Sequence, residues 1–226
     1  ARQREFIRSN TFDDLRLQLQ THRSFHMIRT FLAASLIAAS APAALAQQAM
    51  ADQAPMADED QMMMHIGPSV GDTFAEFTAL STAGEAQTLA NLSGEAGAVI
   101  VFSRSLDWCP FCKRQAIDLK DAAAPLAELG WDLNLITYDD PDTLADYAGD
   151  NEIPYTLLSD KDSAMINAFH LRNTEVPAGS RYDGIPHPAI IFLSPEGEVL
   201  AMLREEGYQN RPPVDVVLET AGELAN

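Results

Sequence analysis

The chain has 226 residues, a formal net charge of −18 at neutral pH and 46% hydrophobic residues. So large an excess of acid argues against nucleic acid as a partner, because phosphate backbones are bound by clusters of Lys and Arg. The length suits one domain with a substantial core, together with short additional segments.

Residues 27–46 have the pattern of a secretory signal. A basic start at Met27–Thr30 leads into the apolar run Phe31–Ala39, and Ala44–Ala46 offers a small-x-small cleavage site. The apolar run is shorter than the roughly 20 residues that a membrane-spanning helix needs, so no membrane anchor is expected in the mature protein. The sequence therefore predicts a periplasmic or secreted protein, cleaved after Ala46.

Two further segments surround this signal. Residues 1–26 precede it and are expected to be upstream translated or non-native sequence without a function. Residues 47–65 are rich in Ala, Gln, Met and acid, lack periodicity and predict a flexible tail. Cleavage would remove 6 of 15 basic and 3 of 33 acidic residues, which leaves 180 residues with a net charge of −21. Residues 66–226 remain as the one folded domain.

Strand and helix patterns alternate along this domain. Short apolar pieces over 66–93 predict a small hairpin or edge structure, and the continuous run Ala98–Phe102 predicts a strand buried on both faces. A helix is expected from Pro110 to Leu129, kinked or shortened at Pro125. The later elements are a strand over 133–137, helices over 141–149 and 161–171, strands over 189–193 and 199–203 joined by a turn, and a helix over 213–224. The alternation indicates an α/β fold, a mixed sheet with helices on both faces.

The only two cysteines lie three positions apart in Trp108-Cys109-Pro110-Phe111-Cys112. A disulfide in so small a loop stabilises little, because the chain-entropy effect grows with loop length. The pair stands where a buried strand passes into a helix, and the helix dipole favours a thiolate there. We therefore expect a redox pair in which Cys109 is the exposed nucleophile and Cys112 resolves it. Arg104 and Lys113 are candidate cations for the Cys109 thiolate, whereas zinc is not expected, since the chain has no second Cys pair.

The Trp108–Cys112 motif after an apolar strand resembles the thioredoxin active site, and Gly184–Leu193 resembles the cis-proline strand that faces it. With Gly71–Phe77 ahead and an extra strand and helix between the two motifs, the layout is similar to the alkyl hydroperoxide reductase and thiol-specific antioxidant family, the peroxiredoxin-like redoxins. The resemblance covers most of residues 66–217. It implies a thioredoxin-like fold and a thiol-disulfide oxidoreductase or thiol-dependent peroxidase without a cofactor, which exchanges electrons with a partner thiol or disulfide protein.

The same resemblance implies roles for residues near the cysteines. Pro188 would follow a cis peptide bond and present backbone groups to the substrate, unless Pro186 holds that place. His187 would lie beside the sulfurs and either tune the thiolate or carry a proton, or it would be a solvent-facing loop histidine. Trp108 would be a packing cover over the site.

The sequence departs from the peroxiredoxin pattern just before Cys109. Phe102 and Leu106 stand seven and three residues ahead of it, where the family has Pro and Thr or Ser. Ser103 stands where many thioredoxins carry a buried acid. Asp107 is near enough to assist proton transfer, but we expect it to be the helix N-cap. Disulfide exchange with slow peroxide turnover is the resulting expectation.

Two functions from other classes compete with this one. Copper handling is the first, because soft thiolates, His187 and the Met62–His65 tail suit Cu(I). The second is a non-catalytic redoxin fold used for assembly, which the intact cysteine pair argues against.

Overall fold

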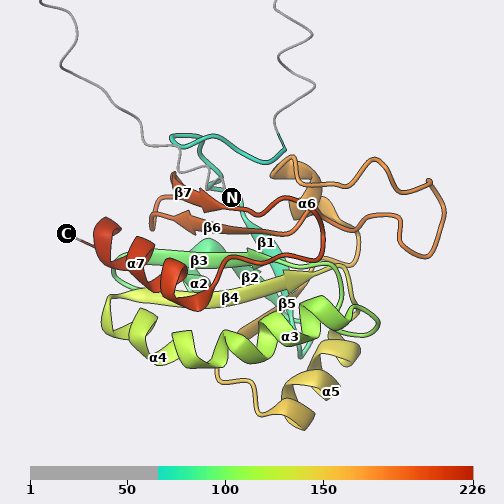
Figure 1. Cartoon of the computed structure of the whole chain (residues 1–226), viewed down its shortest axis with the longest axis horizontal. Helices are drawn as coiled ribbons and strands as arrows, with labels where there is room; N and C mark the ends of the chain where they lie inside the picture. Colours follow the sequence, from blue (N-terminus) through green and yellow to red (C-terminus); the bar gives the residue numbers. More distant parts are fainter. Residues whose placement is uncertain (1–65, 226) are drawn as a thin grey trace, which may run out of the picture. The chain divides into compact units, whose positions relative to one another are not determined.

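A mixed sheet of seven strands organises the part of the chain that the computed structural model describes, residues 66–225 (Figure 1). The strands are β1 (Thr78–Ser81), β2 (Ala86–Thr88), β3 (Gly97–Phe102), β4 (Trp131–Thr137), β5 (Thr156–Ser159), β6 (Ala189–Leu193) and β7 (Val199–Leu203). They lie in the order β2-β1-β5-β4-β3-β6-β7. β4 pairs in parallel with β3 and β5, and all other neighbours are antiparallel. The predicted mixed α/β sheet of the thioredoxin-like class is confirmed.

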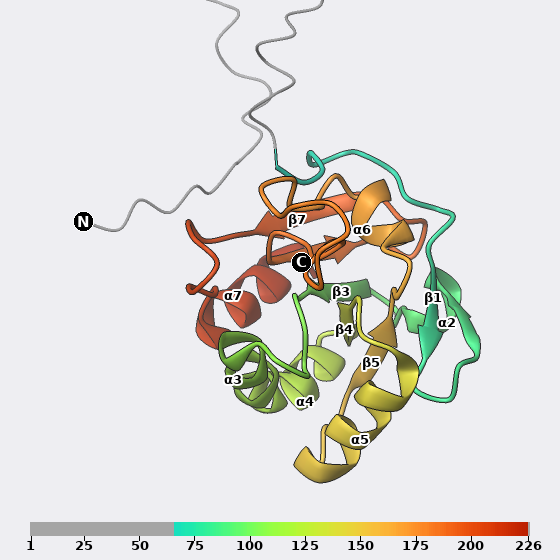
Figure 2. The same cartoon turned by 90° about the vertical axis from the view of Figure 1, so that its right-hand side faces the viewer.

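Helices cover both faces of this sheet (Figures 1 and 2). The helices are α2 (Leu89–Leu92), α3 (Pro110–Asp118), α4 (Lys120–Glu128), α5 (Pro141–Asn151), α6 (Ala164–Ala168) and α7 (Val214–Leu224). Buried residues of α3, α4, α5 and α7 share one core cluster, and those of α2 and α6 share the other. The predicted helices on both faces are confirmed, and the sheet separates two cores.

The central strand β3 shows why a continuous apolar run is needed here. All six of its residues are buried. Val99 and Val101 belong to the core on the α3 side, whereas Ala98, Ile100 and Phe102 belong to the core on the α6 side. Because alternate side chains of a strand point to opposite faces, a strand between two helical layers must be apolar at every position.

Two of the predicted helices differ from the observed ones. The single helix expected over 110–129 is two helices in series, interrupted at Leu119, and Pro125 lies inside the second. The ring of Pro125 removes one backbone donor and crowds the carbonyl four residues earlier, close to this interruption. The helix expected over 161–171 is the shorter α6, because Ser163 and His170 on either side adopt left-handed backbone angles, with φ of 55° and 54°.

The predictions for residues 1–26, the signal at 27–46 and the tail at 47–65 lie outside the described residues. In the range 66–225, no helix is both long enough and apolar enough to cross a bilayer.

Candidate active site

Four chain segments meet at one end of the central strands of the sheet. Phe102 at the end of β3 lies opposite Ile136 of β4 and opposite Ala189, the first residue of β6. Ile190 in turn pairs with Leu203, the last residue of β7. The segments that follow β3, β4 and β7 therefore meet the segment that precedes β6, and the cysteine motif lies in the first of them.

Cys109 and Cys112 form a disulfide at the start of α3. Cys109 is the N-cap of this helix, and its Sγ accepts a hydrogen bond from the Cys112 N–H at 3.3 Å. The prediction that Asp107 caps the helix is therefore wrong, because Asp107 is two residues too early and donates its own N–H to the Ser105 hydroxyl. Pro110 occupies the first helical turn, where its missing N–H costs nothing.

The predicted exposure of Cys109 is also wrong. Its side chain is 1% exposed and that of Cys112 is 0% exposed. Trp108 and Phe111 pack against the core cluster that contains both cysteines. Both sulfurs are therefore shielded from solvent in this structure.

An aromatic cluster with an arginine in it lies around Trp108. The indole Nε1 donates to the hydroxyl of Tyr138 at 2.9 Å, and Tyr182 meets the indole edge to face at 4.7 Å. The guanidinium of Arg104 lies 5.0 Å from the Trp108 ring and 4.7 Å from the Tyr208 ring. Tyr182 and Tyr208 are 37% and 50% exposed, so the outer side of the cluster faces solvent.

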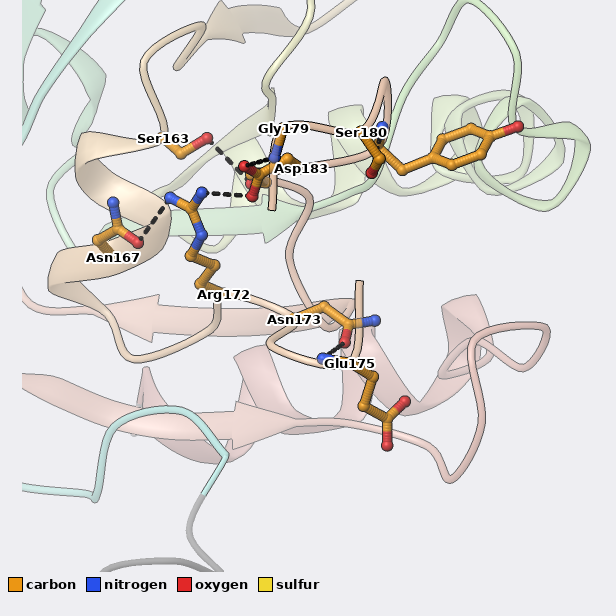
Figure 3. A network of polar contacts seen from close by, with 10 residues as sticks. Ser163, Asn167, Arg172, Asn173, Glu175, Gly179, Ser180 and Asp183 are labelled. Carbon is orange, nitrogen blue, oxygen red and sulfur yellow. Dashed lines mark hydrogen bonds and ion pairs between the residues drawn. The ribbon is translucent and has the colours of Figure 1, made fainter. Parts of the chain in front are cut away.

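The loop that carries Tyr182 is held by a polar network (Figure 3). Arg172 pairs with Asp183 at 2.6 Å and also donates to Asn167 at 3.3 Å. The other Asp183 oxygen accepts the Gly179 N–H at 2.7 Å, and the Ser163 hydroxyl donates to the carbonyl of Gly184 at 3.0 Å. These contacts hold Asp183 and Gly184, the residues that follow Tyr182, and Tyr182 in turn contacts Trp108.

Acidification is expected to loosen this loop before the core unfolds. The Gly179 N–H and Arg172 hold the pKa of Asp183 below its usual range. A depressed carboxyl pKa stabilises the fold above the unfolded value of about 3.9 and stops doing so as the pH falls through the folded value. In Trp131→Phe protein, whose remaining tryptophan is Trp108, fluorescence should change at higher pH than the far-ultraviolet circular dichroism. With Asp183→Asn added, the Trp108 fluorescence at neutral pH should already match that of the acid-loosened loop. A fluorescence spectrum unchanged by that substitution would contradict the role of the ion pair.

A buried acid that the sequence analysis did not single out lies beside the cysteine loop. Asp139, two residues after β4, accepts hydrogen bonds from the Ser105 hydroxyl at 2.7 Å, the Leu106 N–H at 2.6 Å and the Thr137 hydroxyl at 2.9 Å. Burial raises the pKa of its carboxyl, and these hydrogen bonds partly oppose the rise. Its position after a buried strand parallel to β3 was the available signal, because the carboxyl ends of parallel neighbours share an edge.

A cation that the sequence analysis also missed contacts a sulfur. Nη2 of Arg211, between β7 and α7, lies 3.3 Å from Sγ of Cys112. Arg104 instead contacts aromatic rings, and Lys113 makes hydrogen bonds through its backbone N–H and carbonyl. The predicted action of Arg104 and Lys113 on the Cys109 thiolate stays a prediction.

The predicted cis bond before Pro188 is wrong, since the described part of the chain contains no cis peptide bond. Pro186 forms a β-bridge with Arg172, and the His187 N–H donates to the Leu171 carbonyl at 2.7 Å. This segment is thus already extended as it enters β6, a conformation that a trans X-Pro bond fits. Burial first, then the charges of Arg204 and Arg104, lower the pKa of His187, while Glu175 opposes them. The roles of Pro188 and His187 in the site stay predictions.

Metal ligands do not cluster in the range that the structure covers. No group of three or more His, Cys, Asp or Glu side chains there could hold a metal ion. The Met62–His65 part of the copper hypothesis lies outside the described residues. The copper alternative therefore gains no support.

Comparisons with known proteins agree on one family. The model of the AhpC/TSA family matches residues 70–202. Peroxiredoxin Bcp of Escherichia coli K12 is 28% identical over 129 residues, which are 57% of this chain and 81% of that protein. Among solved structures, peroxidoxin BcpB of Mycobacterium tuberculosis has a TM-score of 0.58 at 22% identity and covers 71% of this chain and 97% of its own. Peroxiredoxin Q of Xanthomonas campestris has a TM-score of 0.56 at 23% identity, with 66% and 92% covered.

Proposed function

The chain belongs to the AhpC/TSA family, a thiol-dependent redox enzyme family with peroxiredoxin-like antioxidant function, and we propose that it acts through a Cys109–Cys112 dithiol. The disulfide at the start of α3 carries this proposal. A sulfur at a helix N-terminus that accepts a backbone N–H is favoured as a thiolate, and the second sulfur is already within bonding reach of the first. The similarity to peroxiredoxin Bcp of Escherichia coli supports peroxide as one substrate.

Oxidation of the dithiol by a substrate and its reduction by a partner protein both balance without a cofactor. With a disulfide substrate, the Cys109 thiolate attacks one sulfur and expels the other as a thiolate, and Cys112 then attacks Cys109 to release the second. With a hydroperoxide, Cys109 takes one oxygen to become a sulfenic acid and releases the alcohol or water. Cys112 then condenses with the sulfenic acid, forming the disulfide and releasing one water. Two thiols of a partner protein reduce the pair again and become a disulfide themselves.

We expect disulfide exchange to be faster than peroxide turnover. Phe102 and Leu106, which stand where the peroxiredoxin pattern has Pro and Thr or Ser, are 0% and 1% exposed and belong to the cores. They offer the peroxide no hydroxyl donor at these two positions. Peroxide reduction depends on placing the O–O bond against the thiolate, so an apolar surrounding should slow it.

The proposal is tested by mixing the reduced protein with one equivalent of hydrogen peroxide or of glutathione disulfide. Both oxidants should oxidise the two protein thiols of each chain, the disulfide at the higher rate: peroxide is reduced to water, and glutathione disulfide is released as two glutathione thiols. Peptide mapping should recover the Cys109–Cys112 bond. Protein with both cysteines replaced by serine is the control and should consume neither oxidant. Loss of thiols without formation of this bond would overturn the dithiol mechanism.

Export is proposed from the sequence pattern over residues 27–46. Expression in a bacterium that secretes through such signals should give a protein whose intact mass begins at Gln47. A mature form that still contains Phe31–Ala39 would contradict this proposal.

A further inference from the structure

Arg211 is held rigidly next to the inner cysteine. Its Nε donates to the side-chain oxygen of Gln115 at 2.8 Å, and its Nη1 donates to the carbonyls of Tyr208 and Asn210, both at 2.7 Å. Nη2 is thereby left for Sγ of Cys112, at 3.3 Å. Four acceptors thus fix the guanidinium, and the sulfur is one of them.

The charge of Arg211 lacks a carboxylate partner among residues 66–225, where Arg172 and Asp183 form the one ion pair. Its other three acceptors are an amide and two carbonyls, which are neutral. Burial, together with repulsion from Arg104, lowers the pKa of Arg211 to about 10. A partly buried cation of this kind is stabilised whenever a neighbouring atom becomes an anion.

We propose that Arg211 is the counter-ion of the Cys112 thiolate, and that it thereby favours the reduced form of the cysteine pair. When a partner thiolate attacks Cys109, the S–S bond breaks and its electron pair leaves on Cys112, beside the guanidinium. A second partner thiol then releases Cys109 and completes the partner's disulfide. A leaving thiolate of lower pKa leaves faster, and a stabilised reduced form makes the pair the stronger oxidant.

Other charged and titratable groups near the start of α3 must be considered with Arg211. They are Arg104 and Asp107 on the preceding loop, Lys113 and Arg114 on the helix, Tyr208 beside Arg211, and Tyr147 and Tyr155, which donate to the carbonyls of Lys113 and Ala116. Burial raises the pKa of both Tyr147 and Tyr155, so these two are neutral at physiological pH. Arg211 differs from every one of them in its contact with a sulfur.

The redox equilibrium with glutathione tests this proposal without a measurement of enzymatic turnover. Arg211→Gln should shift the equilibrium about tenfold towards the disulfide, which equals about 30 mV for a two-electron couple. It should also raise the pKa of Cys112, which is measured from the pH dependence of the alkylation of that cysteine in Cys109→Ser protein. Arg211→Lys should recover part of both shifts. Arg114 lies at an exposed site on α3, the helix that carries Cys112. Arg114→Gln removes an equal charge and should shift the equilibrium less than about twofold.

A second variant keeps Arg211 in place. Gln115→Glu puts a carboxylate where the amide now accepts from Nε, so it should compete with the thiolate for the guanidinium and shift the equilibrium in the same direction as Arg211→Gln. Equal effects of Arg211→Gln and Arg114→Gln, or wild-type equilibria in both Arg211→Gln and Gln115→Glu, would overturn the proposal. The proposal rests on the redox use of the pair. A protein that equilibrates with glutathione yet catalyses the reduction of neither a peroxide nor a protein disulfide would refute the proposed enzymatic function and leave the role of Arg211 standing.

Discussion

Replacing Cys112 by serine is expected to leave the protein covalently joined to its disulfide substrate through Cys109. Attack by Cys109 forms a mixed disulfide, and the thiol that would resolve it is absent. Non-reducing mass spectrometry after incubation with glutathione disulfide should find about one glutathione per chain, bound at Cys109. With peroxide alone the same variant should accumulate sulfenic acid at Cys109, which a dimedone label detects.

The reciprocal variant, Cys109→Ser, distinguishes the roles of the two sulfurs. Cys109→Ser should neither trap glutathione nor reduce peroxide, because the sulfur at the helix N-cap is gone. In the wild-type protein, alkylation at mildly acidic pH should label Cys109 before Cys112, since the pKa of Cys109 should fall below the roughly 8.5 of a free thiol. Glutathione trapped on Cys112 in the Cys109→Ser variant would instead assign the attack to the sulfur next to Arg211.

The elements that frame the site follow from local patterns in the sequence. The apolar runs of β3 and β6 are needed because both strands lie between two helical layers, and each is entirely buried. Pro110 and the motif around it indicated the start of α3, and the observed helix begins at this residue. Such features depend on neighbours along the chain, so the sequence alone reveals them.

The features that the sequence did not reveal depend on contacts between distant segments. Arg211 and Cys112 are 99 positions apart, and Asp139 is 33 positions from Leu106. The burial of Cys109 likewise depends on how Trp108 and Phe111 pack on the completed core. The cis bond expected at Pro188 came from a resemblance, and the pairing of Pro186 with Arg172 holds the actual chain in an extended form. Tertiary structure decides such details after the elements are formed.

Replacing Asp139 by alanine is expected to give one of the largest losses of stability in the protein, about 3 kcal/mol, measured by urea unfolding. The change leaves the buried N–H of Leu106 and the hydroxyls of Ser105 and Thr137 without their acceptor. The loop ahead of Cys109 should loosen as well, so the reduced variant should be alkylated faster at this cysteine.

Two comparisons separate the lost acceptor from the lost charge. Asp139→Asn keeps a carbonyl oxygen that can still face the Leu106 N–H, so it should cost only about 1 kcal/mol. Asp140→Ala, at an exposed neighbour whose side chain does not cap α5, should change stability by less than about 0.5 kcal/mol. An Asp140→Ala variant as unstable as Asp139→Ala would contradict the argument.

The pH dependence of the stability lost in Asp139→Ala also tests the direction of the pKa shift of Asp139. Burial raises the pKa of this carboxyl, so the folded protein favours its protonated form. Ionisation therefore costs the wild-type protein stability as the pH rises from the unfolded value of about 3.9 through the folded value. The difference between wild type and Asp139→Ala should accordingly be larger at acidic than at neutral pH, provided that both are still folded. A difference that grows towards neutral pH would mean that the hydrogen bonds from Ser105, Leu106 and Thr137 outweigh the burial of the charge.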